Sequence, residues 1–483
     1  MQKKFILNLL FVLLLNVIVK PFYILGIDAE VLKQTGEDYG IYFSLLGLTF
    51  ILNIFLDIGI VNFNTKNIAQ HQHLLQKHFS GIITLRLLLS LVYFVLVFGV
   101  AWALDYPKEY YTLLAILAFN QVLVGFILYL RSNLAGLLLF KQDSILSVLD
   151  RFILIFILSY LLWFRTSTTA FAIEWFALAQ TFAYSITLVI ALFLVIKKTG
   201  RFKLGFNKLF SLAILRKSLP YATLILLMMI YYRSDAIMLE RMLPNGKEET
   251  ALYAQGYRFF EAFNMIGFLF AGLLLPLFSK LLKQKKDIAP LLFTSFKIIV
   301  AVSVILATAT YNNKIDIIAW RYQISGNQLV HSASSFGVLM GCFVAVSSTY
   351  IFGTLLTANG SLKYLNRLAL FGVGLNFLLN FLLIPNYGAY GASLASFITQ
   401  LITLAGQVIL VFVWMKVRID YSAMRSIILF LIGISIAYFS FTTYVHTYWF
   451  YQFILFGGVG IMLAFITKMI DIKALVLMLK NRK

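Results

Sequence analysis

Apolar stretches of about twenty residues recur along the whole chain, with short polar or charged breaks between them. An α-helix of about this length is what a chain needs to cross the hydrocarbon core of a membrane. Apolar residues make up 61% of the 483 residues, against roughly 45–50% in soluble domains, and this excludes a soluble protein. We therefore predict an all-α polytopic membrane protein with fourteen spans, at 5–26, 40–61, 79–104, 111–130, 145–164, 172–196, 213–238, 251–278, 290–310, 331–357, 364–384, 388–414, 425–444 and 450–467.

The N-terminal pattern is shared with signal peptides, because Lys3 and Lys4 precede an apolar run from Phe5 to Val19. No small-residue cleavage site follows and the run continues to Gly26, so we interpret it as a first span that stays attached. The single cysteine, Cys342, excludes a disulfide within the chain.

The charges of the loops predict the orientation. The chain has 40 Lys+Arg and 19 Asp+Glu, a formal net charge of +21, and cytoplasmic loops of membrane proteins are enriched in Lys and Arg. With a cytoplasmic N-terminus, 28 of the cations fall in cytoplasmic segments and seven in outer segments, whereas eleven acids fall outside and five inside. This count places Arg151 in the cytoplasmic segment 131–151, and Asp28 and Glu30 in an outer loop. We predict that both termini face the cytoplasm.

The longest basic segment, Lys197–Lys217, contains seven cations and no acid. Six predicted spans precede it and eight follow, so we interpret it as a linker between two lobes. Attraction to anionic lipid headgroups explains its charge, and we expect no nucleic-acid partner. The predicted domains are an N-terminal six-helix lobe at 1–196, the linker at 197–217, a C-terminal six-helix lobe at 218–415, and two additional helices with a cytoplasmic tail at 416–483.

The two predicted lobes begin with similar patterns. In the first, Tyr39-Gly40 follows a polar outer loop and leads into the second span. In the second, Tyr253, Gly256 and Tyr257 follow the polar loop Pro244–Thr250 and lead into the next span. Paired halves of this kind are typical of transporters whose binding site lies between the halves.

These patterns resemble the polysaccharide flippases of the multidrug/oligosaccharidyl-lipid/polysaccharide (MOP) exporter superfamily, over about residues 1–415. The matching residues are Tyr39-Gly40, Gly59, Ala69, Pro220, Asp235, Tyr253, Gly256-Tyr257-Arg258, Pro276 and Ser279. The most specific match is the segment 385–392, whose sequence Pro-Asn-Tyr-Gly-Ala-Tyr-Gly-Ala resembles the family's Pro-x-Tyr-Gly-x-x-Gly-Ala hairpin between the eleventh and twelfth helices. The resemblance implies two lobes that rock about a central cavity open alternately to each side.

The hairpin also has a direct physical interpretation. Pro385 ends one helix, and Gly388 can adopt the backbone angles of a tight reversal. Small residues after it, including Gly391 and Ala392, allow close approach of a neighbouring helix. We interpret the segment as a feature of the fold rather than as a substrate contact.

Charged side chains inside a bilayer are the candidate functional residues, because each costs roughly 2.5–3.5 kcal/mol on lenient insertion scales and usually faces a wet cavity or a partner. Once the charges counted in the cytoplasmic and outer segments are set aside, five cations and three acids remain for the spans. Because the planar fork of arginine suits phosphate oxygens, we predict that an anionic headgroup is bound by Arg86, Arg233, Arg258, Lys297 and Lys20. A carboxylate at this depth can carry a proton or a sodium ion, so we predict ion coupling or gating by Asp57, Asp235 and Glu261. By depth, Asp57, Arg86 and Lys297 group toward the inner side and the other five toward the outer side.

Each of these charges also has a structural interpretation. Arg258 and Glu261 are three residues apart and can pair on one helix. Charges near the ends of spans can extend to the membrane interface. Arg233 and Asp235 are two residues apart and cannot share a helix face, so each needs a separate partner.

The sequence contains no P-loop motif, so the chain itself has no signature of nucleotide binding. We predict no cofactor, and transport driven by a proton or sodium gradient or by downhill consumption of the substrate. His71, His73 and His78 cluster in a predicted cytoplasmic loop without a nearby Cys or carboxylate, and we expect no metal site there.

The resemblance implies a flippase and not an enzyme. The function it implies is to move undecaprenyl-pyrophosphate-linked oligosaccharide from the cytoplasmic to the outer leaflet of the bacterial inner membrane for O-antigen, capsule or exopolysaccharide synthesis. The predicted partners are this lipid-linked sugar, membrane lipids and other polysaccharide-assembly proteins. One alternative is a drug/cation antiporter of the same superfamily, which we expect to have a cavity dominated by acids. Another is a membrane polysaccharide polymerase, which we expect to have a catalytic outer loop longer than the roughly 20 residues available here.

Overall fold

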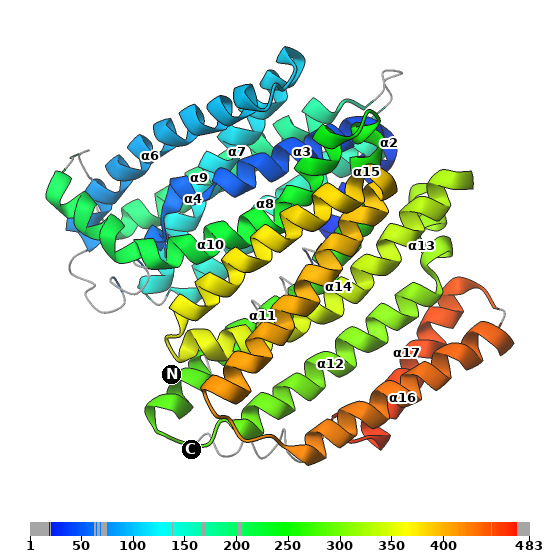
Figure 1. The fold of residues 1–483 in the computed structure, drawn as a ribbon. Helices are drawn as coiled ribbons and strands as arrows, with labels where there is room; N and C mark the ends of the chain where they lie inside the picture. Colours follow the sequence, from blue (N-terminus) through cyan, green and yellow to red (C-terminus); the bar gives the residue numbers. More distant parts are fainter. Residues whose placement is uncertain are drawn as a thin grey trace. The chain divides into compact units, whose positions relative to one another are not determined.

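The computed structural model describes residues 19, 21–61, 64, 68, 75–137, 139–165, 171–199, 205, 207–445 and 447–470. Within these residues every regular element is a helix, which confirms the predicted all-α class. The chain divides into two compact units, Met1–Ala251 and Leu252–Lys483, here called unit 1 and unit 2. Figure 1 shows the long helices that make up each unit.

Unit 1 has its apolar core between α6, α7 and α9, where Phe79, Ile82, Tyr129, Leu130 and Val195 are buried in one cluster. Its elements in chain order are the π-helix η1 (Tyr23–Asp28), α2 (Ala29–Thr35), α3 (Glu37–Leu52), α4 (Ile54–Asp57), α6 (Leu75–Ala103), the 3₁₀ turn η3 (Lys108–Tyr110), α7 (Tyr111–Gly136), α8 (Phe140–Ser159), the π-helix η4 (Tyr160–Phe164), α9 (Ile173–Thr199), α10 (Lys208–Met242) and the start of α11 (Gly246–Lys283).

The polar segment after Gly26 is helical, so its prediction as a loop is wrong, while its position on the outer side stays a prediction. η1 and α2 continue to Thr35, and Gly36, with φ of +54°, ends the helix. Asp28 is 2% and Glu30 8% exposed. Hydropathy assigned these residues to water, but no glycine or proline interrupts the helix before Gly36, and polar side chains alone do not end a helix.

Two glycines allow α3 to lie close to its neighbours. A Cβ atom on Gly40 would be 2.0 Å from the carbonyl oxygen of Lys247, and one on Gly47 would be 3.2 Å from the carbonyl oxygen of Arg233. The two glycines are seven residues apart and lie two turns apart on one helix face. Gly40 belongs to the Tyr39-Gly40 pattern of the sequence, so this part of the pattern has a packing role.

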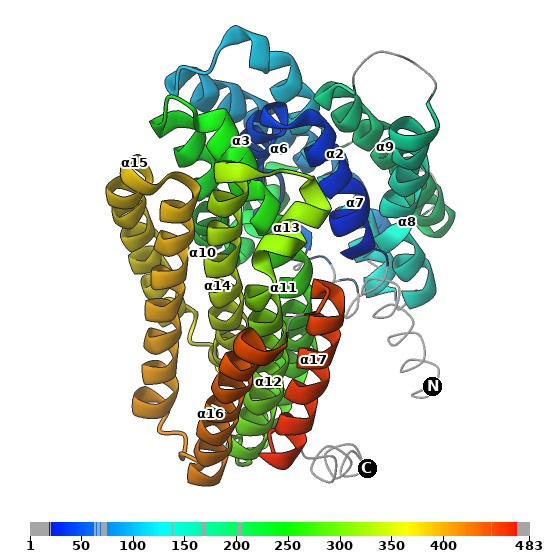
Figure 2. The same cartoon turned by 90° about the vertical axis from the view of Figure 1, so that its right-hand side faces the viewer.

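Unit 2 contains most of α11 and then, in chain order, α12 (Ala289–Asn312), α13 (Lys314–Tyr322), α14 (Gly326–Ala358), α15 (Leu362–Ile409), the π-helix η5 (Leu410–Trp414), α16 (Tyr421–Tyr444) and α17 (Trp449–Ile466). α14 packs against both α12 and α15. α16 and α17 pack against α12 and against each other (Figure 2).

The predicted hairpin is present inside α15. The chain turns back at Gly388, where φ is +52° and ψ is −132°, so that α15 consists of two helical arms (Figure 1). Gly391 is also required, because a Cβ atom there would be 2.4 Å from the carbonyl oxygen of Leu383. In the second arm Ser393 is fully buried and its hydroxyl lies 2.6 Å from that of Ser335 on α14. These contacts support the interpretation of the hairpin as a feature of the fold.

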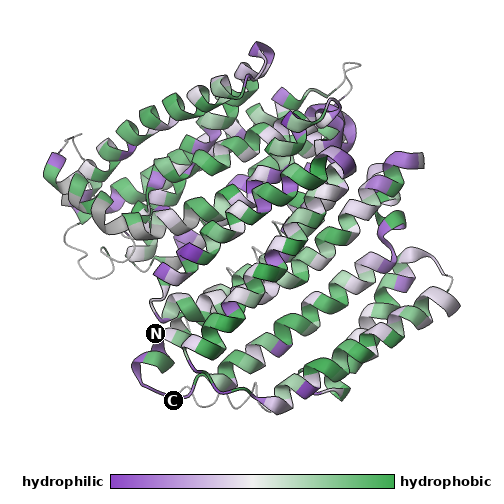
Figure 3. Cartoon of the chain, viewed as in Figure 1, coloured by the Kyte–Doolittle hydropathy of each residue, from purple (hydrophilic) through white to green (hydrophobic). Residues whose placement is uncertain are grey.

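α16 and α17 present large apolar side chains to the outside of unit 2. Ile436 and Phe439 are 62% and 67% exposed, and Met462 and Ile466 on α17 are similarly exposed. Both helices are mainly hydrophobic along their length (Figure 3). Such continuous exposed apolar surface is expected of helices that face lipid.

Ten helices of the described residues are long and apolar enough to cross a membrane. One of them, Leu362–Trp414, contains both arms of the hairpin and so two of the predicted spans. Each predicted span from 40–61 onward coincides with a helix, and 5–26 lies mostly outside the described residues. The number of fourteen spans stays a prediction.

The boundary between the two units lies between Ala251 and Leu252, later in the sequence than the predicted linker at 197–217. α10, which was predicted to open the second lobe, packs along α3 and belongs to unit 1. The units group helices by contacts within one conformation, whereas the predicted lobes follow the order and charge of the spans. The lobe boundaries therefore stay a prediction.

Candidate functional site

The structure describes seven of the eight charged residues predicted to form the site; Lys20 lies outside the described residues. It brings two pairs together, Asp57 with Arg86 and Arg258 with Glu261. The members in unit 1 are Asp57, Arg86, Arg233 and Asp235, and those in unit 2 are Arg258, Glu261 and Lys297.

Arg86 of α6 forms a close ion pair with Asp57 at the end of α4, with 2.6 Å between Nη1 and Oδ1. Its Nη2 donates to the carbonyl oxygen of Gly125 at 2.8 Å, and its Cζ lies 5.7 Å and 5.5 Å from the ring centroids of Phe126 and Tyr129. These contacts offset the cost of burying the guanidinium. The Arg86 side chain is 2% exposed, so in this conformation it joins α4, α6 and α7 and has little surface left for a ligand.

The helix α4 ends at Asp57, and the turn that follows positions the Asp57 side chain. Ile58 and Gly59, which follow it, have φ of +45° and +78°, and a positive φ is strained for a β-branched residue such as Ile58. The carboxylate of Asp57 accepts a hydrogen bond from the N–H of Val61 at 3.2 Å. Asp57 therefore satisfies a backbone donor after the turn while its other contact is the ion pair.

Arg233 and Asp235 on α10 have different surroundings. The Cζ of Arg233 lies 4.6 Å from the ring centroid of Phe50 on α3, and Arg233 is half-buried. Asp235 is 2% exposed. The close approach of the two helices at Gly47 brings Arg233 to the ring, a cation–π contact suited to a cation away from water.

α8 carries a further cation near the middle of a candidate span. Asp150 and Arg151 lie near the centre of Lys141–Phe164. The Nη1 of Arg151 donates to the hydroxyl of Tyr184 at 2.9 Å, and its Cζ lies 4.8 Å from the ring centroid of Tyr23. Its Nε is 3.9 Å from the carboxylate of Asp150, and its side chain is 28% exposed. Arg151 is therefore held by aromatic side chains and is still accessible.

Arg151 lies within α8 and not in the connection between α7 and α8, so it does not belong among the loop charges. α8 begins at Phe140, so Lys141 lies at the end of the helix and Arg151 about 15 Å further along it. The predicted span 145–164 and the cytoplasmic segment 131–151 overlap at Arg151, and its assignment to the segment removed it from the candidate site residues.

Asp28 is another charge that the sequence prediction missed, and it is buried. The hydroxyl of Tyr39 donates to its Oδ2 at 2.8 Å. The ring of Tyr39 lies 5.2 Å from that of Tyr42, whose hydroxyl accepts a hydrogen bond from Gln180 at 2.9 Å. These polar contacts connect η1, α3 and α9 inside unit 1. The prediction missed them because it placed Asp28 in a loop.

Arg258 and Glu261 of α11 pair within one helix, with 2.5 Å between Nη1 and Oε2. Their side chains are 8% and 19% exposed. Beside them, Gly256 packs so closely on α14 that a Cβ atom would lie 2.9 Å from the Cα of Phe336. The ion pair confirms the predicted pairing of Arg258 and Glu261 on one helix. Their predicted roles in headgroup binding and in ion coupling or gating stay predictions.

Lys297 of α12 donates to the carbonyl oxygen of Lys468, just beyond α17, at 2.9 Å. A cation at this position stabilises the free carbonyl groups at the end of a helix. The predicted role of Lys297 in headgroup binding stays a prediction.

Side-chain amides inside the units connect helices. Asn53 donates to Gln121 at 2.6 Å, Asn120 to the carbonyl oxygen of Ala177 at 3.0 Å, and Asn264 to the hydroxyl of Tyr350 at 3.3 Å. Polar contacts of this kind between helices are common in membrane proteins.

Cations at one end of unit 1, outside its spans, contact aromatic rings. The Nζ of Lys247 lies 5.1 Å from the ring centroid of Tyr110, and a hydrogen bond with Tyr110 raises the pKa of Lys247 above its usual value. The Cζ of Arg241 lies 4.8 Å from the ring centroid of Tyr106, and burial raises the pKa of the Tyr106 hydroxyl. Lys247 therefore stays charged at neutral pH, as expected of a side chain at a membrane interface.

Among the described residues, no three His, Cys, Asp or Glu side chains are grouped so that they could hold a metal ion. His71 and His73 lie outside these residues. The expectations of no cofactor and of a proton or sodium gradient stay predictions.

The fold is that of transporters of the MOP superfamily. The lipid II flippase MurJ, in an inward closed conformation, matches with a TM-score of 0.69 over 96% of this chain and 100% of that chain, at 16% identity. An inward-facing multidrug resistance MATE family transporter matches with a TM-score of 0.60 over 82% of this chain and 94% of that chain, at 14% identity. A MOP superfamily transporter from Pyrococcus furiosus, described by the reverse polarity of its binding pocket, matches with a TM-score of 0.53 over 84% of this chain and 92% of that chain, at 15% identity. The protein is thus a multi-pass membrane protein with the MOP transporter fold.

The sequence comparison is more specific about the family. The polysaccharide biosynthesis protein family matches residues 5–282, more than half of the chain, and the chain belongs to this family. An uncharacterized membrane protein of Methanocaldococcus jannaschii is 25% identical over 392 residues, which cover 76% of this chain and 88% of the relative. These findings confirm the predicted family.

Proposed function

We propose that this protein is a flippase that moves an undecaprenyl-pyrophosphate-linked oligosaccharide from the cytoplasmic to the outer leaflet, for O-antigen, capsule or exopolysaccharide assembly. The observation that carries the proposal is the set of arginines at membrane depth inside a fold shared with a lipid II flippase. Charged residues at this depth are rare and usually functional. The arginine side chain suits the oxygens of a pyrophosphate.

The arginines differ in how open they are to a ligand. Arg151 is 28% exposed, and its 3.9 Å separation from Asp150 is too long for a hydrogen bond. A phosphate oxygen can take the place of this carboxylate at hydrogen-bonding distance. Arg233 is half-buried, and its guanidinium lies over the ring of Phe50 at a predicted span depth. We therefore assign the headgroup contacts in unit 1 to Arg151 and Arg233. Arg86 is instead assigned to the contacts that join α4, α6 and α7 in the interior.

The family and the fold support transport by alternating access, with the sugars crossing inside the protein and the lipid tail remaining in the bilayer. Asp57, Asp235 and Glu261 are the proposed ion-coupling or gating acids, and Asp28 joins them because it is buried beside tyrosine hydroxyls. We propose a proton or sodium gradient as the energy source, with no cofactor, and other polysaccharide-assembly proteins as partners.

Complementation of a flippase-null strain tests the function. The triple variant Arg151→Gln, Arg233→Gln and Arg258→Gln, at an unchanged protein level, should lose complementation because the anionic headgroup is no longer bound. The matched control replaces Arg165, Arg241 and Arg321, which lie outside the predicted spans, with Gln and should complement. Full activity of the first triple variant would contradict the proposed headgroup site.

A drug/cation antiporter is the second candidate function, and the buried carboxylate of Asp28 favours it, because cations are bound by acids. Efflux of a cationic dye from cells that carry the protein distinguishes the two functions. Dye efflux that is lost in Asp28→Asn, without complementation of the flippase-null strain, would favour the antiporter.

We propose that the protein lies in the bacterial inner membrane with both termini in the cytoplasm. Replacing Cys342 with Ser gives a background free of cysteine for labelling. In this background Gln284→Cys and Gln328→Cys introduce single exposed cysteines in loops predicted to lie inside and outside. An impermeant maleimide should label residue 328 in right-side-out vesicles and residue 284 in inside-out vesicles. The opposite pattern would invert the orientation.

A further inference from the structure

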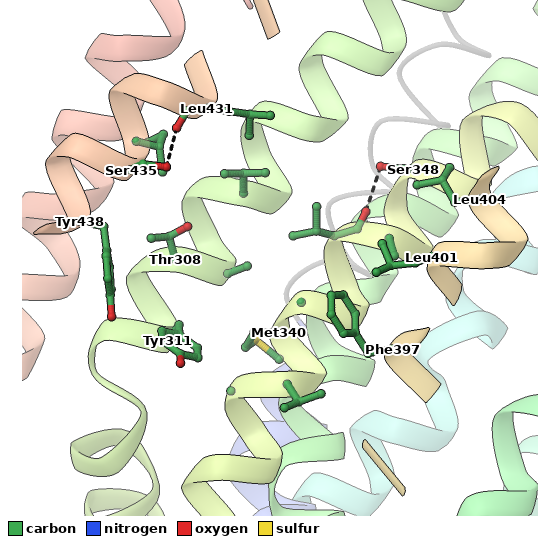
Figure 4. Close-up of a pocket in the computed structure, with 18 of the residues that line it drawn as sticks. Thr308, Tyr311, Met340, Ser348, Phe397, Leu401, Leu404, Leu431, Ser435 and Tyr438 are labelled. Atoms are coloured by element: carbon green, nitrogen blue, oxygen red, sulfur yellow. Dashed lines mark hydrogen bonds between the residues drawn. The ribbon is translucent and has the colours of Figure 1, made fainter. Parts of the chain in front are cut away.

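A groove of about 700 Å³ lies on unit 2 between α12, α14, the second arm of α15, and α16 (Figure 4). Its walls are mainly apolar and include Val344, Phe397 and Leu401. The hydroxyls of Ser348 and Ser435 in the groove donate to the carbonyl oxygens four residues earlier, each at 2.9 Å. The serines therefore have their donors satisfied, and the body of the groove suits an apolar ligand.

Two glycines of α14 shape the floor of the groove. Gly337 and Gly341 are four residues apart and share a helix face. A Cβ atom on Gly337 would lie 3.0 Å from the ring of Tyr311, and one on Gly341 would lie 3.1 Å from the ring of Phe397. The rings of Tyr311 and Phe397 therefore lie against these glycines, where a side chain would crowd them, and they form part of the walls of the groove.

The length of the groove matches one leaflet of a bilayer. Along α14 it extends from Gly337 to Ser348, about 16 Å at the rise of an α-helix. The hydrocarbon core of a membrane is about 30 Å thick. The end near Tyr311 lies one residue before the end of the candidate span Ala289–Asn312. The groove therefore extends from one membrane interface to about the middle of the core.

The interfacial end of the groove is polar and basic. The rings of Tyr311 and Tyr438 have centroids 6.2 Å apart, and the Nζ of Lys314 lies 4.1 Å from the centroid of the Tyr311 ring. Lysine and tyrosine at this depth are positioned to contact lipid phosphates.

We propose that this groove binds a membrane phospholipid with an anionic headgroup, with one acyl chain along the apolar walls and the headgroup at Lys314, Tyr311 and Tyr438. A depth of one leaflet fits an acyl chain, whereas an isoprenoid tail as long as that of the proposed transport substrate would extend far beyond the groove. Lys314 supplies the charge that favours an anionic headgroup over a zwitterionic one. The site requires no transport and is independent of the proposed function.

Photo-crosslinking tests the groove. The full chain is reconstituted in phosphatidylcholine vesicles that contain a small share of phosphatidylglycerol with a photoreactive group in the middle of one acyl chain. Label should appear on peptides of α14 and of the second arm of α15 that line the groove. Ser435→Trp should lower this label by about tenfold, equivalent to about 1.4 kcal/mol of binding, because the indole fills the space that the chain occupies.

The matched control is Ser440→Trp, on the same helix. Ser440 is also exposed, its hydroxyl donates to the carbonyl oxygen four residues earlier at 2.9 Å, and it does not line the groove. Ser440→Trp should leave the label unchanged, and equal labelling of the two variants would overturn the proposal. If Ser435→Trp does not fold, Leu431→Trp fills the same wall.

The headgroup and the identity of the lipid are tested separately. Lys314→Gln should lower labelling by the phosphatidylglycerol probe and leave labelling by the same probe on phosphatidylcholine unchanged; equal labelling of wild type and variant by phosphatidylglycerol would overturn the anionic site. Unlabelled phosphatidylglycerol should compete better than undecaprenyl phosphate. Stronger competition by undecaprenyl phosphate would assign the groove to an isoprenoid chain and overturn the proposal. None of these results depends on flippase activity.

Discussion

In unit 1, charged side chains reach partners on other helices, whereas in unit 2 the contacts described between helices come from serine and amide side chains, and the ion pair of α11 lies within one helix. In unit 1, Arg86 reaches Asp57 from another helix, and Arg151 reaches Tyr184. In unit 2, Ser335 and Ser393 join two helices, while the charged pair of α11 lies on one helix.

The difference between the units indicates which charged side chains also stabilise the fold. A charge whose partner lies on another helix contributes to packing, so its replacement affects both folding and transport. An ion pair within one helix joins no second helix, so its loss disturbs the packing between helices less. Loss of the ion pair of Arg258 and Glu261 therefore separates function from stability better than loss of the pair of Arg86 and Asp57.

The largest expected effect of the comparison is that of Arg86→Ala. The substitution leaves the carboxylate of Asp57 without its cation, and breaking a buried pair of this kind costs about 3 kcal/mol. We expect the free energy of unfolding to fall by about this amount, measured by unfolding of the purified protein in lipid-containing detergent. Arg86→Lys keeps the charge but not the planar fork, so its free energy of unfolding should lie between those of the wild type and Arg86→Ala.

Wild-type stability of Arg86→Ala would break the comparison, because it would mean that the interhelical pair of unit 1 does not stabilise the fold.

Ser393→Ala in unit 2 should have a smaller effect. It removes the hydroxyl that lies 2.6 Å from Ser335 and that donates to the carbonyl oxygen of Ala389 at 2.9 Å. Loss of one buried hydrogen bond costs about 1 kcal/mol, measurable by the same unfolding experiment. Ser334→Ala, which changes the half-buried serine beside Ser335 whose hydroxyl donates within α14, should leave the stability unchanged. An equal loss in both variants would show that the serine contact between α14 and α15 is not the cause.

Glu261→Gln should have the smallest effect on stability. Gln keeps the shape of Glu and an oxygen that can accept from Arg258 on the same helix, so the change removes the charge of a pair three residues apart, a geometry that contributes roughly 0.2–0.5 kcal/mol. The free energy of unfolding should change by no more than about this amount. A loss as large as that of Arg86→Ala would show that Glu261 also holds another helix and would remove the contrast between the units.

Much of the fold could be predicted because it depends on local sequence properties. The length of each apolar stretch predicted the helices from residue 40 onward, and Pro385 and Gly388 predicted the reversal in α15. The segment around Asp28 was mispredicted as a loop because its polar residues are buried by packing with Tyr39, which hydropathy along the chain cannot show.

The site could be predicted in composition but not in pairing. Depth along the spans grouped Asp57 with Arg86, and they do form a pair. Arg151 was missed because the count of loop charges took it from its own span, and its contacts with Tyr23 and Tyr184 depend on helices distant in sequence. Contacts between helices arise only in the packed structure, whereas the Arg258 and Glu261 pair follows from spacing alone.

Translocation of a fluorescent undecaprenyl-pyrophosphate-linked oligosaccharide across proteoliposomes tests the central claim most directly. We expect wild-type protein to expose the headgroup to an impermeant quencher much faster than protein-free liposomes do. The double variant Arg151→Gln and Arg258→Gln should be slower by at least about tenfold, corresponding to about 1.4 kcal/mol of lost headgroup interaction. A wild-type rate no greater than that of protein-free liposomes, with folded protein and an imposed proton or sodium gradient, would contradict the account.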